Sequence, residues 1–384
     1  MNVSMRCFER LSAMRALVVV TGVLLAAVPA WAHKSSDAYL QLQGDARGVS
    51  TLRVDVALRD LDAVLDLDAD GDGRLTWGEI KASWPAIDRY VQANVRLDGC
   101  RLTGAAPALE RRSDGVYAAL AFAPRCSGGG VPEIRYTLFA DVDPTHRGLA
   151  RIEIEGRPTS VEVLDPRQPR AAKSGSGSAS GEPRTGFLGE GVQHILTGYD
   201  HVLFLLCLLL PAVMRRTPSG WQPVERIGQA LWPTVAIVTT FTVAHSITLA
   251  LAALGLIALP SWFIEPAIAV TIVLAALDNL WPIFRGRRGA ITFAFGMIHG
   301  FGFAGVLAEL HLPTSQFAWA LLQFNLGLEL GQLAIVAAAL GVLYFGRQRR
   351  RYVGWVLQGG SSVAIVIGVV WFIQRTAQPA WLQL

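Results

Sequence analysis

Six long apolar segments occupy the second half of the chain and constrain its fold more than any other feature. A helix that rises about 1.5 Å per residue needs about 20 residues to cross about 30 Å of hydrocarbon. Each segment reaches that length, and we predict an all-α bundle of six transmembrane helices over residues 186–376. The segments cover approximately 187–213, 231–257, 261–284, 290–310, 316–345 and 354–374.

The first 32 residues have the pattern of a secretory signal peptide. Three arginines precede a short apolar core at 16–28, and Ala30-Trp31-Ala32 provides a small-x-small cleavage site. An uncleaved anchor helix is the alternative, which the short apolar run disfavours. Cleavage would leave His33 as the first residue. Its imidazole and free α-amine could then chelate a metal ion, unless it is an incidental terminal residue.

The distribution of arginines predicts the orientation of the bundle. With an exported N-terminus, the predicted outer loops at 258–260 and 311–315 hold no Lys or Arg. The predicted inner loops hold Arg215, Arg216, Arg226, Arg285, Arg287, Arg288, Arg347, Arg349, Arg350 and Arg351. This asymmetry follows the positive-inside rule. We expect a multi-pass protein of a bacterial-type inner (plasma) membrane, with its N-terminal domain exported to the periplasm.

The exported domain is predicted over 33–165, followed by a flexible Gly- and Ser-rich linker at 166–185. It carries 18 Lys+Arg against 21 Asp+Glu over 33–170, so it offers no basic surface for a nucleic acid. Two helical patches lie near 60–67 and 77–94. Alternating polarity predicts strands at 39–43, 51–58, 116–122, 133–139, 151–155 and 161–164. We expect a β-rich, sandwich-like domain with a helical insertion.

That insertion contains a calcium-binding pattern at 68–79. Carboxylates fall at positions 1, 3 and 5 of an EF-hand loop, and Gly73 at position 6 permits the sharp turn. A degenerate acidic turn is the alternative. The expected Ca²⁺ ligands are Asp68, Asp70, Asp72, the carbonyl of Arg74, Thr76 and Glu79.

Two of the four cysteines are predicted to form a disulfide. Cys7 leaves with the signal peptide, and Cys207 lies in an apolar helix. Cys100 and Cys126 remain in the exported region, where an oxidising compartment favours pairing over free thiols.

Four histidines lie within the apolar segments: His194, His201, His245 and His299. An ionisable group in hydrocarbon costs about 3 kcal/mol or more, so it normally faces a partner, a pore or a ligand. Neutral imidazole is a good ligand for divalent transition metals. In a regular helix, His194 and His201 would lie two turns and about 10.5 Å apart. Either each joins ligands from other helices, or the helix breaks near Gly198.

Carboxylates accompany these histidines. Asp200 could orient an imidazole by accepting its N–H, as carboxylates beside metal ligands do. Glu265 and Glu329 lie in two further spans and could compensate charge or exchange protons. Each polar residue also has a simpler interpretation, as a group bonded to its own helix backbone or holding two helices together.

The polar motifs of the bundle together resemble the HupE/UreJ family of membrane proteins over roughly 187–374. The resemblance rests on His194-x5-Asp200-His201, Phe241-x3-His245-Ser246, His299-Gly-Phe-Gly and Phe324-Asn325-x3-Glu329-x2-Gln332. It implies a nickel- or cobalt-permease-like protein, of the longer branch with an exported domain. His194, Asp200, His201, His245, His299, Glu265 and Glu329 would then form the transition-metal path.

We therefore expect a transporter or channel for a divalent transition-metal ion such as Ni²⁺, with a calcium-binding exported domain. The exported domain could capture metal or dock an envelope metal-binding protein. One alternative is a membrane-embedded, Zn²⁺-dependent hydrolase that uses the histidines and Ser246 to activate water. A second is a calcium-stabilised envelope scaffold. No catalytic residue is assigned.

Overall fold

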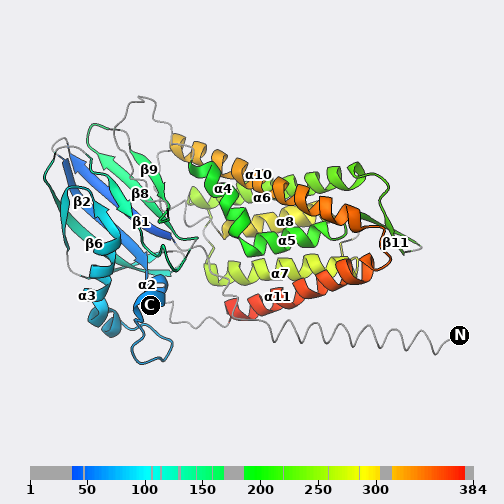
Figure 1. Ribbon diagram of the computed structural model, residues 1–384, viewed down its shortest axis with the longest axis horizontal. Coiled ribbons are helices and arrows are strands. Elements are labelled where there is room, and N and C mark those ends of the chain that lie inside the picture. The colour runs from blue at the N-terminus through cyan, green and yellow to red at the C-terminus, as the bar shows by residue number, and fades with distance from the viewer. Residues whose placement is uncertain are drawn as a thin grey trace.

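The protein has a sheet part formed by its N-terminal residues and a helical part formed by its C-terminal residues (Figure 1). The computed structural model describes residues 37–45, 48–104, 107–112, 115–128, 131–143, 145–157, 159–167, 186–218, 220–257, 259–284, 286–302 and 314–376. The predicted signal peptide, most of the linker, and His33 lie outside the described residues.

The sheet part is built on one mixed sheet in the order β4-β6-β2-β1-β8-β9, with β5 also paired to β6. Neighbours are antiparallel except β1 and β8, which run parallel. Its strands are β1 (Asp37–Asp45), β2 (Gly48–Ala57), β4 (Cys100–Gly104), β5 (Ala108–Arg112), β6 (Gly115–Cys126), β8 (Arg147–Ile154) and β9 (Ser160–Leu164). A separate ribbon pairs β3 (Val95–Leu97) with β7 (Ile134–Tyr136).

One face of the sheet holds the core of this part. Side chains alternate along a strand, so Ala38, Leu40 and Leu42 of β1 all point to the same side. There they pack with the helices α2 (Leu58–Leu65) and α3 (Trp77–Asn94) and with the β3–β7 ribbon. The sandwich-like prediction was wrong in this respect, because helices and a short ribbon cover the sheet where a second large sheet was expected.

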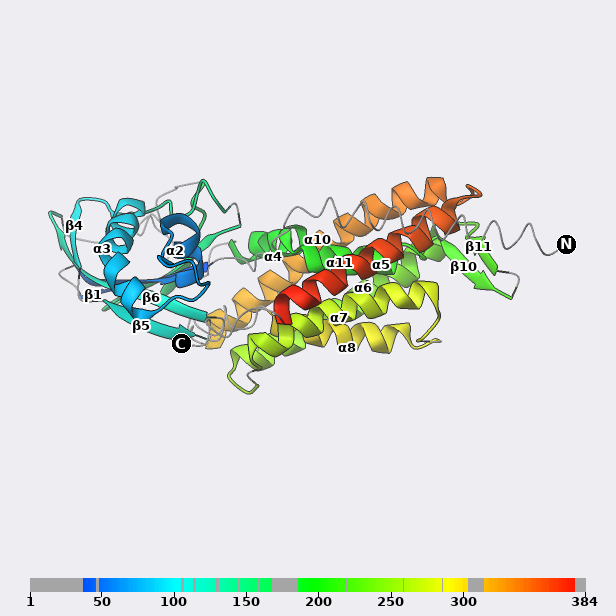
Figure 2. The same cartoon turned by 90° about the horizontal axis from the view of Figure 1, so that it is seen from below.

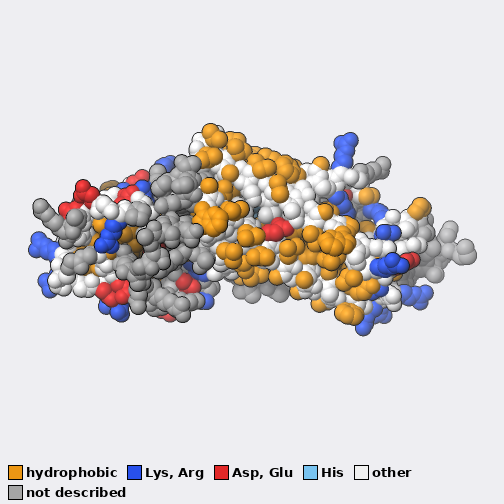
Figure 3. Space-filling view, turned by 90° about the horizontal axis from the view of Figure 1, so that it is seen from above, with side chains coloured by type: hydrophobic (Ala, Val, Ile, Leu, Met, Phe, Trp, Pro, Cys, Tyr) orange, Lys and Arg blue, Asp and Glu red, His pale blue; other side chains and the backbone are white. Residues whose placement is uncertain are grey.

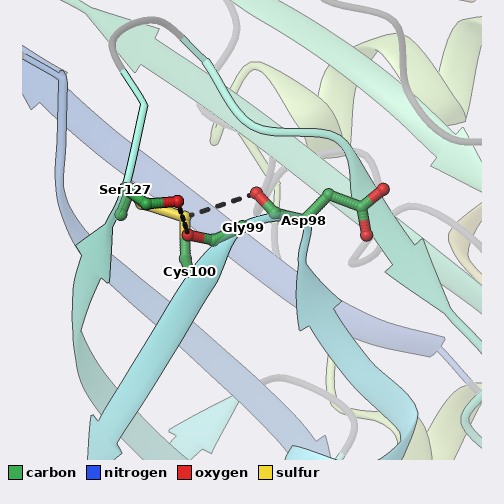
Figure 4. Close-up of a disulfide and its surroundings, with 5 residues drawn as sticks. Asp98, Gly99, Cys100 and Ser127 are labelled. Atoms are coloured by element: carbon green, nitrogen blue, oxygen red, sulfur yellow. Dashed lines mark hydrogen bonds between the residues drawn. A yellow bond between two sulfur atoms is a disulfide. The ribbon is translucent and has the colours of Figure 1, made fainter.

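The disulfide joins the ends of the paired strands β4 and β6. Cys100 lies opposite Cys126 in the register, and the structure links the two sulfur atoms (Figure 4). The Ser127 hydroxyl and backbone N–H both donate to the Gly99 carbonyl, at 3.1 and 3.0 Å. The disulfide therefore ties the edge strand β4 to its neighbour β6.

The helical part contains long apolar helices that run side by side away from the sheet (Figures 1 and 2). They are α4 (Gly186–Thr197), α5 (Tyr199–Leu209), α6 (Gly228–Ala253), α7 (Ser261–Leu280), α8 (Arg288–Phe301), α10 (Thr314–Gly346), and the π-helical segment η1 (Tyr352–Gly359) continued by α11 (Gly360–Thr376). A hairpin that the sequence did not predict, β10 (Met214–Thr217) with β11 (Gly220–Pro223), follows α5.

We name the two ends of this part by what lies there. At the sheet end, α4, α6 and α10 contact the sheet. At the arginine end lie the β10–β11 hairpin and the turns that follow α7 and α10. Hydrophobic side chains form a broad band over the helices, and basic side chains gather beyond it (Figure 3). The described arginines of the arginine end are Arg215, Arg216, Arg226, Arg287, Arg288, Arg347, Arg349, Arg350 and Arg351.

Four continuous helices of the described residues are long and apolar enough to cross a membrane, and a fifth span results if α4 and α5 count as one bent span. The four cover Gly228–Ala252, Ser261–Leu280, Ala318–Gly346 and Tyr352–Thr376. In the described residues α8 has 14 residues, fewer than the about 20 that a span needs. The chain is thus a multi-pass membrane protein, while a count of six spans stays a prediction.

The second face of the sheet packs against the sheet end of the helices. Tyr39 and Tyr117, which alternate with the core residues of β1 and β6, join Phe187 of α4 and Phe324 of α10 in one buried cluster. Arg147 of β8 adds an ion pair to Glu190 of α4, with 3.5 Å between Nε and Oε1. The sheet is therefore buried on both faces, and the two parts share a core.

A buried histidine lies at the edge of the sheet part. His146 is 0% exposed and its Nε2 is hydrogen-bonded to the Tyr136 hydroxyl. Burial lowers the pKa of His146 from 6.5 to about 3, with Asp143 opposing and Arg147 adding to this shift. At a pH between about 3 and 6.5, His146 therefore binds a proton in the unfolded chain but not in the folded chain.

We predict that the free energy of unfolding falls as the pH is lowered from about 6.5 toward 3. The stabilisation is fully present above pH 6.5 and is lost at about 1.4 kcal/mol per pH unit for one such group. Replacing His146 by Gln should flatten this dependence. Denaturant titrations of the two proteins between pH 7 and 4 would measure it, and equal slopes would contradict the assignment.

Candidate functional site

A break at Gly198 brings the first two histidines together. The axes of α4 and α5 differ by 68° across this residue. As a result the ring centroids of His194 and His201 lie 5.0 Å apart. Of the two possibilities that the sequence left open, the structure has the helix broken at Gly198. A side chain at 198 would crowd the His194 carbonyl at 2.7 Å and the His201 Nδ1 at 2.9 Å, so only glycine fits this corner.

Two further helices complete a cluster of four imidazoles. The ring of His245, from α6, lies 5.9 Å from that of His201 and 6.3 Å from that of His194. The ring of His299, from α8, lies 4.9 Å from that of His201. His201, His245 and His299 are buried. We call these four side chains the histidine cluster.

Glycines on α8 allow this approach. A Cβ atom at Gly300 would lie 2.0 Å from the Thr248 Oγ1 and 2.6 Å from the His245 carbonyl oxygen. At Gly296 it would lie 2.5 Å from the Phe241 carbonyl oxygen. The small glycines therefore let α6 and α8 pack closely beside His245 and His299.

Hydrogen bonds fix two of the rings. Asp200 Oδ1 accepts the backbone N–H of His201 at 2.9 Å and lies 3.0 Å from its Nδ1. Because a carboxylate only accepts, Nδ1 carries the proton and Nε2 keeps its lone pair. On the other side, the Thr271 hydroxyl donates to the Ile268 carbonyl at 2.7 Å and accepts from His299 Nε2 at 2.9 Å. His299 Nδ1 thus keeps its lone pair.

Several buried ring nitrogens have no hydrogen-bond partner in the described part of the chain. They are His201 Nε2, His299 Nδ1 and both nitrogens of His245. Leaving a buried polar atom unpaired costs about 1–3 kcal/mol, which a bound ligand would recover. Imidazole nitrogens are ligands for divalent nickel, cobalt, copper and zinc, so the donor set fits a transition-metal ion.

The ring spacing suits a shared metal ion, but the ring nitrogens do not yet point to one common position. Two imidazoles on one ion, with bonds of about 2.1 Å, place their centroids about 5 Å apart, close to the observed spacing. Yet within the described residues the group of metal-binding side chains with all ligand atoms within 4.8 Å of one another is Asp68, Asp70 and Glu79. The imidazoles would have to rotate to bind one ion together.

Asp200 also connects the cluster to an arginine that the sequence analysis did not single out. Arg375 of α11 approaches Asp200 Oδ2 at 3.5 Å and donates to the Glu265 carbonyl at 3.0 Å. Glu265 therefore lies beside the Asp200–Arg375 pair at the sheet end. Most arginines of the helical part gather at the arginine end, whereas Arg375 lies at the sheet end. An arginine at that end of an apolar helix was the feature of the sequence that could have identified it.

Glu329 lies away from the histidine cluster. Its Oε1 accepts from the Thr239 hydroxyl at 2.6 Å, between α10 and α6. Thr239 precedes His245 by six residues, which corresponds to about 9 Å along α6 toward the arginine end. The side chain of Gln332 likewise accepts from Thr242 at 2.7 Å. These two bonds link α6 to α10.

Ser246, the residue that a hydrolase would need, points back to its own helix. Its hydroxyl donates to the Thr242 carbonyl at 2.7 Å. This bond is the ordinary state of a serine in an apolar helix. The geometry therefore offers no observation that favours the hydrolase over metal transfer.

The loop at 68–79 lies between α2 and α3, as the sequence pattern requires. Gly73 has φ 77°, which the sharp turn needs. Asp68 accepts the N–H groups of Gly71 and Gly73 at 2.9 and 2.8 Å, and Glu79 accepts those of Ala69 and Thr76 at 3.0 and 2.8 Å. The bonds from Thr76 are the main cause of a lowered pKa of Glu79.

This loop has the oxygen donors that Ca²⁺ takes. Asp68, Asp70 and Glu79 each have a carboxylate oxygen within 4.8 Å of the others. Asp70 and Asp72 accept from the backbone two residues ahead, at 3.1 and 2.7 Å, which holds the loop curved before any ion binds. Hard oxygen ligands in this number fit calcium rather than nickel.

Comparison with known proteins agrees with the geometry of the helical part. The model of the family described as HupE / UreJ protein matches residues 172–375, which include all four histidines of the cluster. No curated protein gives a significant match. The matched region covers more than half of the chain, and among the described residues it takes in the candidate membrane spans up to Arg375. The chain belongs to the HupE/UreJ family of membrane proteins.

Proposed function

We propose that the protein moves a divalent transition-metal ion, of the nickel or cobalt type, across the membrane. One observation carries this proposal: imidazoles from α4, α5, α6 and α8 meet in the helical part with ring centroids 4.9–6.3 Å apart. Structural histidines in a membrane are normally each bonded to a neighbour. Here His245 has no hydrogen-bond partner at either nitrogen in the described residues.

Each residue of the cluster has a distinct part in the proposal. His201 presents Nε2 because Asp200 holds its other nitrogen, and His299 presents Nδ1 because Thr271 holds its other nitrogen. His245 would supply a third nitrogen, and His194 would meet the ion first from the sheet end. Asp200 and Glu265 would lower the cost of bringing a divalent charge into the bilayer.

The proposed orientation places the sheet end outside the cell. The signal-peptide pattern and the gathering of arginines at the opposite end support it. We also propose six spans, as the six apolar segments of the sequence predict, in a bacterial-type inner membrane. The exported sheet part would then cover the end of the helices from which an ion would reach the histidine cluster.

We predict that proteoliposomes containing the protein accumulate at least one of Ni²⁺, Co²⁺, Cu²⁺ and Zn²⁺, and that His201→Ala lowers the uptake at least tenfold. The variant removes the imidazole that contacts the three other rings. His146→Gln, which changes a buried histidine of the sheet part, is the matched control and should retain uptake.

Absence of uptake of all four ions by well-folded protein would contradict the proposal. A hydrolase would instead retain about one tightly held zinc ion and lose turnover on His245→Ala. A scaffold would lose stability, but no metal-dependent behaviour, when all four histidines are replaced.

The orientation of His201 gives a second prediction. Asp200→Asn removes the carboxylate that holds the Nδ1 proton, and such partners of metal-binding histidines are worth about 10–100-fold in affinity. Equilibrium dialysis of the purified protein should show this loss. Asp278→Asn is the control, because Asp278 is likewise paired with an arginine, Arg288, but at the arginine end. Equal losses in both variants would argue against a specific role for Asp200.

We further propose that the loop at 68–79 binds Ca²⁺ and stiffens the exported part. Its ligands would be Asp68, Asp70, Asp72, the Arg74 carbonyl, Thr76 and Glu79. Support comes from the three convergent carboxylates and the preformed turn. Glu79 also caps α3 together with Thr76, so an ion held by Glu79 would fix the start of that helix.

Calcium should raise the melting temperature of the full chain, and Asp70→Asn should lower calcium affinity by on the order of tenfold. Asp70 takes no part in the cap of α3, so this variant should melt like the wild type without calcium. Glu79→Ala should lose both calcium binding and calcium-free stability, because alanine removes the side chain that accepts the Thr76 backbone N–H. Calorimetric titration and thermal melts distinguish the two effects; no heat of binding in the wild type would refute the calcium site.

A further inference from the structure

A phenylalanine lies one helical turn from each of three clustered histidines, always toward the arginine end. On α6 and α8, which run toward the sheet end, Phe241 and Phe295 precede His245 and His299 by four residues. On α5, which runs the opposite way, Phe204 follows His201 by three residues. The helix rises about 5 Å over such a turn, so the three phenylalanines form a second layer below the imidazoles.

The rings of this layer touch one another. The centroids of Phe204 and Phe241 lie 5.2 Å apart, and those of Phe204 and Phe295 lie 5.9 Å apart. All three side chains are buried, with 2%, 2% and 8% exposure for Phe204, Phe241 and Phe295. We call these three residues the phenylalanine layer.

The layer also touches the histidine cluster. His299 lies 5.3 Å from Phe204 and 5.2 Å from Phe241, centroid to centroid, and the Phe241 and His245 rings are stacked at 6.1 Å. Apolar residues of α7 and α11, including Ile272, Ala276, Ala364 and Trp371, belong to the same buried cluster as the layer. Aromatic rings thus close the space directly below the imidazoles.

Such a layer is a barrier for a metal ion. An ion bound by imidazoles exchanges water for nitrogen ligands, but an ion among phenylalanine rings loses its water and gains no strong ligand. Hydrophobic constrictions close channels for the same reason. A path from the histidine cluster to the arginine end therefore requires the rings of this layer to separate.

We propose that Phe204, Phe241 and Phe295 form the barrier that closes the histidine cluster from the arginine end. This inference rests on the proposed function and refines it: the protein acts as a carrier that opens its two ends in turn, and the structure shows it closed at the arginine end. Movement of α5 against α6 and α8 would part the three rings.

The chemical reactivity of a native thiol, Cys207, can test whether the barrier is closed, and this test needs no metal ion. Cys207 follows Phe204 by three residues toward the arginine end, is buried, and packs in the same apolar cluster. Cys100 and Cys126 are joined to each other, so a Cys7→Ser background leaves Cys207 as the free thiol. An impermeant, cationic thiol reagent can then be applied to proteoliposomes from the sheet side.

In that background we expect no modification of Cys207 from the sheet side. Phe241→Ala and Phe204→Ala should each raise its rate of modification about tenfold or more, because they open the layer. The exposed Lys81 of α3, labelled with an impermeant amine reagent, reports which vesicles have the sheet part outside. A membrane-permeant maleimide after unfolding confirms that the thiol is intact.

Phe324→Ala is the matched control. Phe324 is a buried phenylalanine that contacts His194 at 5.4 Å, above the phenylalanine layer, and packs against the sheet part. Its removal should leave Cys207 unreactive from the sheet side. If the alanine variants fail to fold, Phe241→Leu removes the ring and keeps much of its volume, and should raise the rate to a smaller extent.

Three results would overturn the proposal. One is modification of Cys207 without any substitution in the layer, at the rate of Phe241→Ala. Another is unchanged protection of Cys207 in the folded Phe204 and Phe241 variants. The last is an equal rise in Phe324→Ala, which would show a general loosening. Since no metal takes part, failure of the barrier and failure of metal transport remain distinguishable.

Discussion

The break between α4 and α5 is the feature on which the candidate site depends. A helix interrupted within hydrocarbon leaves backbone groups that lipid cannot satisfy, so it persists only where protein groups replace the missing bonds. Here the Gly198 N–H still donates to the His194 carbonyl at 2.9 Å, and the Asp200 carboxylate accepts the His201 N–H beyond the break. Asp200 therefore stabilises the bend and also orients the imidazole that the bend delivers. Loss of either function would separate His194 from His201.

The shared core couples the sheet part to that bend. Phe324 belongs to the cluster that joins the sheet to the helices, and its ring also contacts His194. Gly191 and Gly327 let α4 and α10 approach so closely that a Cβ on either would lie 2.0 Å from a backbone oxygen of the other helix. A displacement of the sheet would therefore act on α4, and through it on the first histidine of the cluster.

Periodicity and motif chemistry predicted much of this architecture. Alternation located β1, β2, β6, β7, β8 and β9, and the helical patches expected near 60–67 and 77–94 correspond to α2 and α3, because these signals are local in the sequence. The short strands β3, β4 and β5 were missed, since they owe their pairing to β6 and β7. The bend at Gly198 could only be left as an alternative. The sequence also does not give the rotation of each helix about its axis, so the bond between Glu329 and Thr239 was not predicted.

The order of layers along the helices follows from the same local spacing. From the sheet end, a polar entrance with Asp200 and Arg375 precedes the imidazoles, and the phenylalanines follow. Beyond them Asn279 ties α7 to the Cys207 carbonyl and to Ser361, at 2.7 and 3.2 Å. These bonds fix α5, α7 and α11 to one another below the phenylalanine layer. In the proposed carrier, α6 and α8, which pack together through Gly296 and Gly300, would therefore move as a pair against α5, α7 and α11 to open the arginine end.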